Sequence, residues 1–116
     1  MRLVTSTVFA LLVAACASVP APTDQIAAAR AMVTQAQPVA AKDAGVELHG
    51  AEDKLKRAEE AMQNGDYLHA RIFAEQAEVD AKYAWAVAES AKAQRAAKEV
   101  ESGIDALRKE LERRQQ

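Results

Sequence analysis

The fold is decided by residues 66–91, which read DYLHARIFAEQAEVDAKYAWAVAESA. Alanine recurs in this stretch with strict 4-3 spacing, at Ala70, Ala74, Ala77, Ala81, Ala84, Ala88 and Ala91. On an α-helix, positions with this spacing share one narrow face. Their small side chains allow a second helix to approach closely. The stretch therefore predicts a helix with an alanine stripe, and we expect the preceding helix of the chain to pack on it.

A turn and another helix precede this stretch. Asn64-Gly65-Asp66-Tyr67 is typical of a tight turn, because Gly65 can adopt the left-handed conformation that ends a helix and Asp66 can cap the next one. Residues 46–64 carry an apolar stripe at helical spacing, formed by Leu48, Ala51, Leu55, Ala58 and Met62. We expect helices over 46–64 and 66–114. At about 1.5 Å per residue, the second of these would be roughly 70 Å long.

A further helix is expected nearer the N-terminus. Thr23 can serve as its N-cap, and apolar residues follow at helical spacing, at Ile26, Ala29, Val33 and Ala36. Pro38 should end this helix after residues 24–37, because proline lacks a backbone donor and clashes with the preceding turn. A turn at 42–45 would follow this helix. In the long helix, we expect Tyr67 and Phe73 to be core residues.

The composition agrees with a helical protein. The chain has 28 alanines, three prolines and four glycines, and alanine is the strongest helix former. We predict one all-α domain over residues 23–116, an antiparallel helical hairpin within a three-helix arrangement that ends in a very long helix. The formal charge of −2 excludes the basic footprint of a nucleic-acid binder.

The long helix carries a second apolar stripe, roughly 150° away from the alanine stripe. Its members are Leu68, Ile72, Val79, Ala86, Ala93, Ala97, Val100, Ile104, Leu107 and Leu111. The last four have the spacing of a coiled-coil seam, although they sustain only about two heptads. A first helix folded over this stripe would be too short to cover it. We expect self-association or a partner helix at Val100, Ile104, Leu107 and Leu111, and a solvated tail is the alternative.

The N-terminus has the layout of a bacterial export signal. A short positive start is followed by an apolar run over residues 3–13, which is too short to span a bilayer. The run Leu12-Val13-Ala14-Ala15-Cys16 resembles the bacterial lipobox. The resemblance implies a signal peptide over residues 1–15, cleavage before Cys16, a lipid on its thiol and acylation of the new N-terminus with a palmitate-type chain. An ordinary signal peptide with an incidental cysteine is the alternative.

Residues 16–22 would then form the lipidated cysteine and a tether that contains Pro20 and Pro22. So short a tether keeps the folded part near its membrane. In such lipoproteins an aspartate directly after the cysteine marks retention in the inner membrane, and Ala17 stands there instead. The resemblance therefore implies an outer-membrane protein that faces the periplasm.

Three blocks of the helical region carry a family resemblance. They are K-L-x-R-A at 54–58, G-D-Y at 65–67 and A-E-Q-A-x-x-D-A at 74–81. Over about residues 24–98 the chain resembles an alanine-rich bacterial lipoprotein family that carries a domain of unknown function (the 4398 family). The resemblance implies a location in the cell envelope and a helical shape, and it brings no activity or site residue. The same hairpin is similar to one tetratricopeptide unit, but at least about three such units are needed to form a peptide groove.

Candidate chemistry is sparse. His49 and His69 fall on different helices, at opposite ends of an antiparallel hairpin, so they cannot share a metal ion. The sequence contains no phosphate-binding loop, nucleophile motif or zinc spacing. We therefore expect no enzymatic activity, no cofactor and no metal site. Tyr83 and Trp85 can line a small groove for a lipid or peptide, or else cap the hairpin and pack on the first helix.

Together these patterns favour a non-enzymatic, lipid-anchored envelope protein that acts as a helical scaffold or adaptor. Its expected partners are the membrane, through Cys16, and a second copy or another envelope protein. The alternative is a small periplasmic accessory factor or carrier that binds a lipid or peptide near Tyr83 and Trp85.

Overall fold

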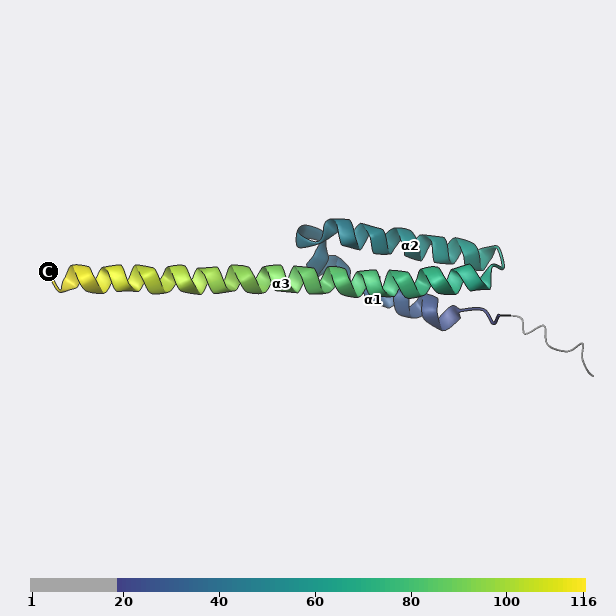
Figure 1. Ribbon diagram of the computed structural model, residues 1–116, viewed down its shortest axis with the longest axis horizontal. Helices are drawn as coiled ribbons and strands as arrows, with labels where there is room; N and C mark the ends of the chain where they lie inside the picture. Colours follow the sequence, from purple (N-terminus) through teal and green to yellow (C-terminus); the bar gives the residue numbers. More distant parts are fainter. Residues whose placement is uncertain (1–18) are drawn as a thin grey trace, which may run out of the picture.

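The computed structural model describes residues 19–116, and the expected signal peptide and Cys16 lie outside this range. Three helices follow one another: α1 (Thr23–Asp43), α2 (Gly45–Gln63) and α3 (Tyr67–Arg114). α1 and α3 run in the same direction and α2 runs against both (Figure 1). The predicted all-α fold with a long C-terminal helix is confirmed, and residues 19–116 contain no strand.

The core is the alanine stripe of α3. Six of its seven alanines are fully buried, and only Ala91 is partly exposed. Near the α1–α2 corner the buried cluster joins Ala81, Ala84 and Ala88 to Val33, Ala36 and Ala40 of α1 and to Leu48 and Ala51 of α2. Nearer the α2–α3 turn a second cluster joins Ala74 and Ala77 to Ile26 and Ala29 of α1 and to Ala58 of α2.

The predicted packing of α2 on this stripe is confirmed, and α1 shares the stripe with it. Both helices pack chiefly against α3. Alanine side chains on α3 leave enough room for two neighbours on the same face. The expected apolar stripe of α2 is confirmed, with Leu48, Ala51 and Ala58 buried and Leu55 and Met62 packed at the edge of the clusters.

The predicted end of the first helix at Pro38 was wrong. α1 continues through Pro38 to Asp43. Pro38 itself is exposed, whereas Ala36 and Ala40 on either side of it are fully buried against α3. Continued burial of this face outweighs the backbone hydrogen bond that proline cannot donate. The turn is consequently shorter than expected, with Ala44 alone between α1 and α2.

The two ends of the hairpin differ in how they are capped. Gly65 has a φ of 75°, and the Asp66 side chain accepts a hydrogen bond from the His69 backbone N–H, as the turn pattern predicted. The predicted cap at Thr23 was wrong, because Thr23 is the first helical residue and follows Pro22, which makes no side-chain cap. Pro22 instead accepts the Ile26 N–H with its carbonyl, at 3.1 Å.

Polar contacts hold the three helices in register. Arg30 on α1 pairs with Glu59 on α2 at 2.5 Å, and Lys54 on α2 pairs with Asp80 on α3. At the α1–α2 corner Asp43 accepts two hydrogen bonds from the Arg95 guanidinium, at 2.8 and 2.7 Å. Arg95 therefore marks where α1 and α2 cease to cover α3. The two aromatic residues that we read as core, Tyr67 and Phe73, are only partly buried.

Candidate functional site

The most distinctive surface of the molecule is the side of α3 that faces away from α1 and α2. We call it the outer face. Its large apolar residues are exposed, and they are Leu68, Ile72, Val79, Tyr83, Val100, Ile104, Leu107 and Leu111. The possibility that the first helix folds over this stripe is contradicted, because α1 lies on the alanine stripe at the opposite side of α3. An exposed apolar row of this length is unusual for a monomer and indicates an interaction surface.

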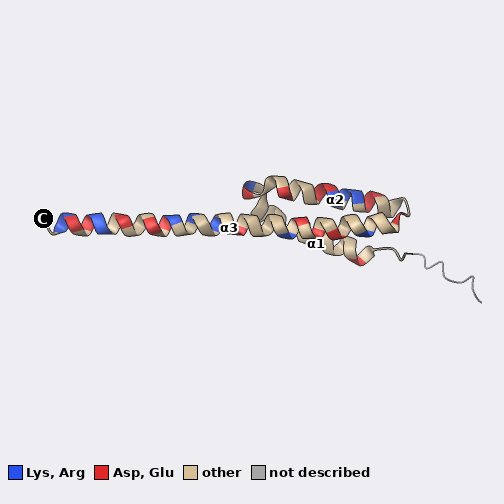
Figure 2. Cartoon of the chain, viewed as in Figure 1, with Lys and Arg blue, Asp and Glu red and all other residues tan. Residues whose placement is uncertain are grey.

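The outer face continues beyond the helices that cover the rest of α3. The distal stripe, which consists of Val100, Ile104, Leu107 and Leu111, has exposed fractions of 64, 45, 67 and 60%. Here α3 runs alone, and acidic and basic residues alternate around it (Figure 2). Its ion pairs are local to the helix, such as Arg114 with Glu110 at 3.0 Å. This half of α3 therefore offers apolar side chains on a helix that carries its own solvating charges.

Tyr83 and Trp85 lie on different sides of α3. Tyr83 is 59% exposed and belongs to the outer face, while Trp85 is 39% exposed. Neither residue lines any of the five shallow hollows described on residues 19–116. A groove for a lipid or peptide at these residues remains a prediction.

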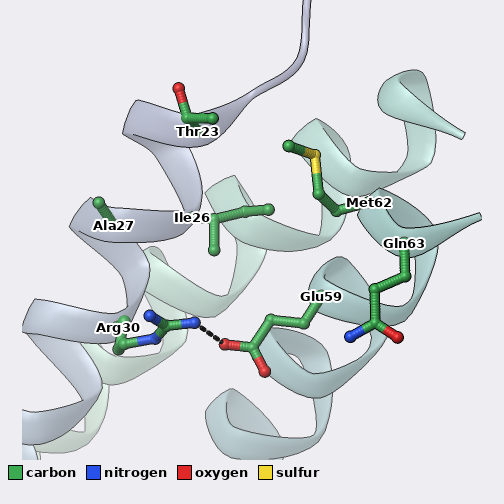
Figure 3. A pocket seen from close by; sticks show the side chains of 7 residues that line it. All are labelled: Thr23, Ile26, Ala27, Arg30, Glu59, Met62 and Gln63. Carbon is green, nitrogen blue, oxygen red and sulfur yellow. Dashed lines mark hydrogen bonds and ion pairs between the residues drawn. The ribbon is translucent and has the colours of Figure 1, made fainter. Parts of the chain in front are cut away.

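A hollow that the sequence pattern did not predict lies between the N-terminal turn of α1 and the end of α2. Figure 3 shows Ile26 and Met62 turned toward the space between the two helices, with the Arg30–Glu59 pair closing one side. The hollow exists because α1 lies next to α2 on α3. The spacing of Ile26, Ala29 and Val33 predicted a buried face on α1 but not which neighbour would cover it.

Among the described residues, the titratable groups form no metal-binding cluster. Within residues 19–116 no three His, Cys, Asp or Glu side chains come together as a metal site would require. His49 on α2 is 84% exposed at its side chain and lies near Glu52. His69 on α3 contacts Asp66 at 2.7 Å. The structure thus does not bring the two histidines together.

Two carboxylates have clear electrostatic roles in the fold. The Arg95 guanidinium, by donating hydrogen bonds, lowers the pKa of Asp43 below its usual value. The backbone N–H and the side chain of His69 lower the pKa of Asp66 in the same way. Both carboxylates therefore serve structural contacts, one at the α1–α2 corner and one at the start of α3.

Cys16, the expected lipidation site, lies outside the described residues, but the chain just after it is placed. Val19 lies beside the α2–α3 turn, where it lines a shallow hollow with Gly65, Asp66, Tyr67 and Leu68. The chain therefore enters the fold at the turn end, while the distal stripe lies toward the other end of α3 (Figure 1). None of the helices within residues 19–116 is long and apolar enough to cross a membrane.

This fold and surface define an all-α protein whose longest helix is covered on one side only. Residues 24–100 match the family model described as a domain of unknown function (DUF4398), and the chain belongs to this family. No curated protein matches the chain, and no solved structure does.

Proposed function

We propose that this chain is a non-enzymatic, lipid-anchored protein of the bacterial cell envelope that serves as a helical scaffold or adaptor. The observation that carries the proposal is the distal stripe on α3. Its four large apolar side chains are all exposed, on a part of the helix that lies beyond α1 and α2. Such a face is typical of a helix that docks against another helix.

The position of Val19 indicates which end of the molecule the proposed anchor would hold at the membrane. Val19 follows Cys16 by three positions, and three residue steps span at most about 10 Å. A lipid on Cys16 would hold the α2–α3 turn close to the membrane surface. From there α3 would extend roughly 70 Å, so the distal stripe would meet partners well away from the lipid.

The proposed location is the outer membrane, with the helices in the periplasm. This rests on the lipobox-like run before Cys16 and on Ala17 after it. The partner of the distal stripe would be a second copy or another envelope protein. Binding of a lipid or peptide at Tyr83 and Trp85 is the weaker candidate, since no hollow described there supports it.

The anchor is tested by expressing the full chain and its Cys16→Ser variant in a bacterial cell and separating membranes from soluble periplasm. We expect the wild type in the outer-membrane fraction with an acyl label on it. The variant should carry no label and should be lost from the outer-membrane fraction. Equal membrane retention and labelling of both forms would rule out Cys16 as the attachment site.

The interaction face is tested with Ile104→Glu combined with Leu107→Glu. Both positions are exposed, so the helices should still form, while a docked partner would be lost because two charges would have to be buried. The readout is a photo-crosslinker placed at Val100. Ala106→Glu, a single charge on the opposite side of the same turn, serves as control and should leave the crosslink intact. A crosslink unaffected by the double substitution would show that the distal stripe is not the docking face.

A further inference from the structure

The outer face follows one heptad register along almost the whole of α3. One set of positions recurs every seven residues: Ile72, Val79, Ala86, Ala93, Val100 and Leu107. A second set lies four residues after the first: Gln76, Tyr83, Ser90, Ala97, Ile104 and Leu111. All twelve side chains are exposed, and only Gln76 and Ser90 are polar. These two sets have the relative spacing of the core positions of a coiled coil.

We infer that this face is covered by a second copy of the same chain, with the two α3 helices packed in parallel and in register from Ile72 to Leu111. The inference deepens the proposed function. Its parallel orientation rests in part on the proposed anchor at Cys16, because two copies held in one membrane at their turn ends must point the same way. The self-association itself rests on the surface of α3.

The length of the outer face supports a pair of copies. Forty residues from Ile72 to Leu111 extend about 60 Å along the helix. A contact strip about 10 Å wide then buries on the order of 1,200 Å² over both copies, which is at the lower limit of specific protein interfaces. The distal stripe alone would bury about a third of this area. A stable pair therefore needs the register to continue over the covered half of α3, and the structure leaves that half free on this side.

The sizes of the side chains along the outer face favour an in-register pair. Large residues occupy both ends, and small residues occupy the middle, at Ala86, Ser90, Ala93 and Ala97. An in-register parallel pair places small residues opposite small ones, so the helices can approach closely there, and apolar residues opposite apolar ones at the distal end. A shift by one heptad would oppose Ala97 to Ile104 and leave poorly filled layers.

The charged residues that flank the outer face favour the parallel arrangement over the antiparallel one. An antiparallel pair with the same overlap would place Asp80 beside Glu101 and Glu75 beside Glu110, at two places each. In the parallel pair the corresponding flanking contacts are Glu89 with Gln94 and Gly103 with Arg108, which carry no repulsion. The one like-charged contact, Glu75 with Asp80, is eased because Asp80 already pairs with Lys54 of its own chain.

The outer face of α3 carries shallow hollows of the kind that coiled-coil packing fills. One shallow hollow on α3 is lined by Ile72, Glu75, Gln76, Val79 and Asp80. Residues at positions i, i+3, i+4 and i+7, here Ile72, Glu75, Gln76 and Val79, make up the hole that receives one side chain from a partner helix in a coiled coil. A second hollow, which includes Ala86 and Ser90, lies two heptads further along the same face.

Disulfide trapping in the full chain tests the proposal. Val79→Cys and Val100→Cys are made separately, expressed in bacterial cells and exposed to a mild oxidant. In a parallel, in-register pair each position faces its own copy within reach of a disulfide. We expect covalent dimer at both positions, forming about tenfold faster than in Ala106→Cys, whose side chain points away from the seam. A mixture of Val79→Cys and Ile104→Cys should give no excess of the mixed dimer.

Two outcomes would overturn the inference, and neither of them by itself contradicts the proposed function. Crosslinking of the Val79→Cys and Ile104→Cys mixture without crosslinking of either valine position alone would mean an antiparallel pair. Crosslinking at both valine positions no faster than at Ala106→Cys would mean that another protein covers the face. A different result would contradict the proposed anchor, namely a disulfide-linked dimer of the wild-type chain. That dimer can form only if the Cys16 thiol is free and carries no lipid. The valine comparison is then repeated in the Cys16→Ser chain.

Discussion

At the scale of single residues, this fold depends on a few polar and backbone features, because its core is made largely of alanine. Alanine buries little apolar area, so each side chain contributes less than a leucine would. The contacts between helices are supplemented by Arg30 with Glu59, Lys54 with Asp80, and Arg95 with Asp43. Of these, only the Arg95 guanidinium contacts both oxygens of its partner, and it joins the last residue of α1 to α3.

The first prediction concerns Asp43. Its pKa lies below the ordinary value of 3.8 because Arg95 stabilises the charged form. The stabilisation is therefore fully present above the ordinary value and is lost as pH falls through the lower pKa of the folded state. We expect Asp43→Asn to lower the melting temperature at neutral pH, and this deficit to shrink as the pH is lowered from about 5 to about 2.

The control for this prediction is Asp105→Asn, which removes a carboxylate that pairs with Arg108 at 3.7 Å within the uncovered half of α3. It should leave the melting temperature unchanged at both pH values. A deficit for Asp43→Asn that stays constant with pH would mean that the ion pair with Arg95 does not contribute to stability.

The second prediction concerns Gly65, the residue with positive φ in the described chain. A Cβ at this position would meet nothing within 4 Å, so the cost of a side chain is conformational and not steric crowding by neighbours. Gly65→Ala should lower the free energy of unfolding by about 1 kcal/mol, and Gly65→Asn by less, because asparagine tolerates the left-handed region better. Chemical denaturation measures both. Equal loss in the two variants would show that the φ of Gly65 is not the cause.

At the scale of elements, the sequence predicted where helices form better than it predicted which helices pack against each other. The α2–α3 turn was predictable because Gly65 and Asp66 act locally, through a backbone conformation and a cap. The end of α1 was not, because the rule for Pro38 is also local, whereas the burial of Ala36 and Ala40 against α3 is a tertiary effect. The same limit applies to the site. The distal stripe was visible in the spacing of its residues, but its exposure depended on where α1 would pack.

Pro38 leads to the third prediction. Because it is exposed within a helix, its main effect is the lost hydrogen bond to the Thr34 carbonyl and the clash of its ring with that turn. Pro38→Ala should therefore raise the free energy of unfolding by about 1–3 kcal/mol. Gln35→Ala, at another exposed position of α1, is the control and should change it little. Destabilisation by Pro38→Ala would mean that the proline shapes the corner in a way that alanine cannot.

The fourth prediction concerns the alanine stripe. Ala81 has no exposed surface and belongs to the cluster that receives both α1 and α2. A leucine there would push both helices away from α3, so Ala81→Leu should cost about 1–3 kcal/mol in the free energy of unfolding. Ala106→Leu adds the same side chain to an exposed position beyond Arg95 and should be nearly neutral. A tolerated leucine at Ala81 would contradict close packing of three helices on this stripe.

At the scale of the whole molecule, the chain is a short three-helix body with a helix that continues out of it. The body lies at the end where Val19 meets the α2–α3 turn, and the free part of α3 begins near Arg95. The free part of α3 packs on neither α1 nor α2, whereas most helical stability in proteins comes from tertiary packing. Burial of the outer face against a second copy would supply the stability that the free part lacks. Shape, anchor and self-association are thus consistent with one arrangement.

The fifth prediction follows from this arrangement and is measured by amide hydrogen exchange at two protein concentrations. In dilute protein, where the pair dissociates, amides between Tyr67 and Arg95 should stay protected by α1 and α2, while those from about Val100 to Leu111 should exchange far faster. At high concentration the distal amides should become protected as the pair forms, because opening then requires dissociation. The body, covered at both concentrations, should change little.

Ile104→Glu provides the control, since it should keep the distal amides exchanging rapidly at every concentration. Strong distal protection in a chain shown to be monomeric would contradict this account of why α3 needs a second copy.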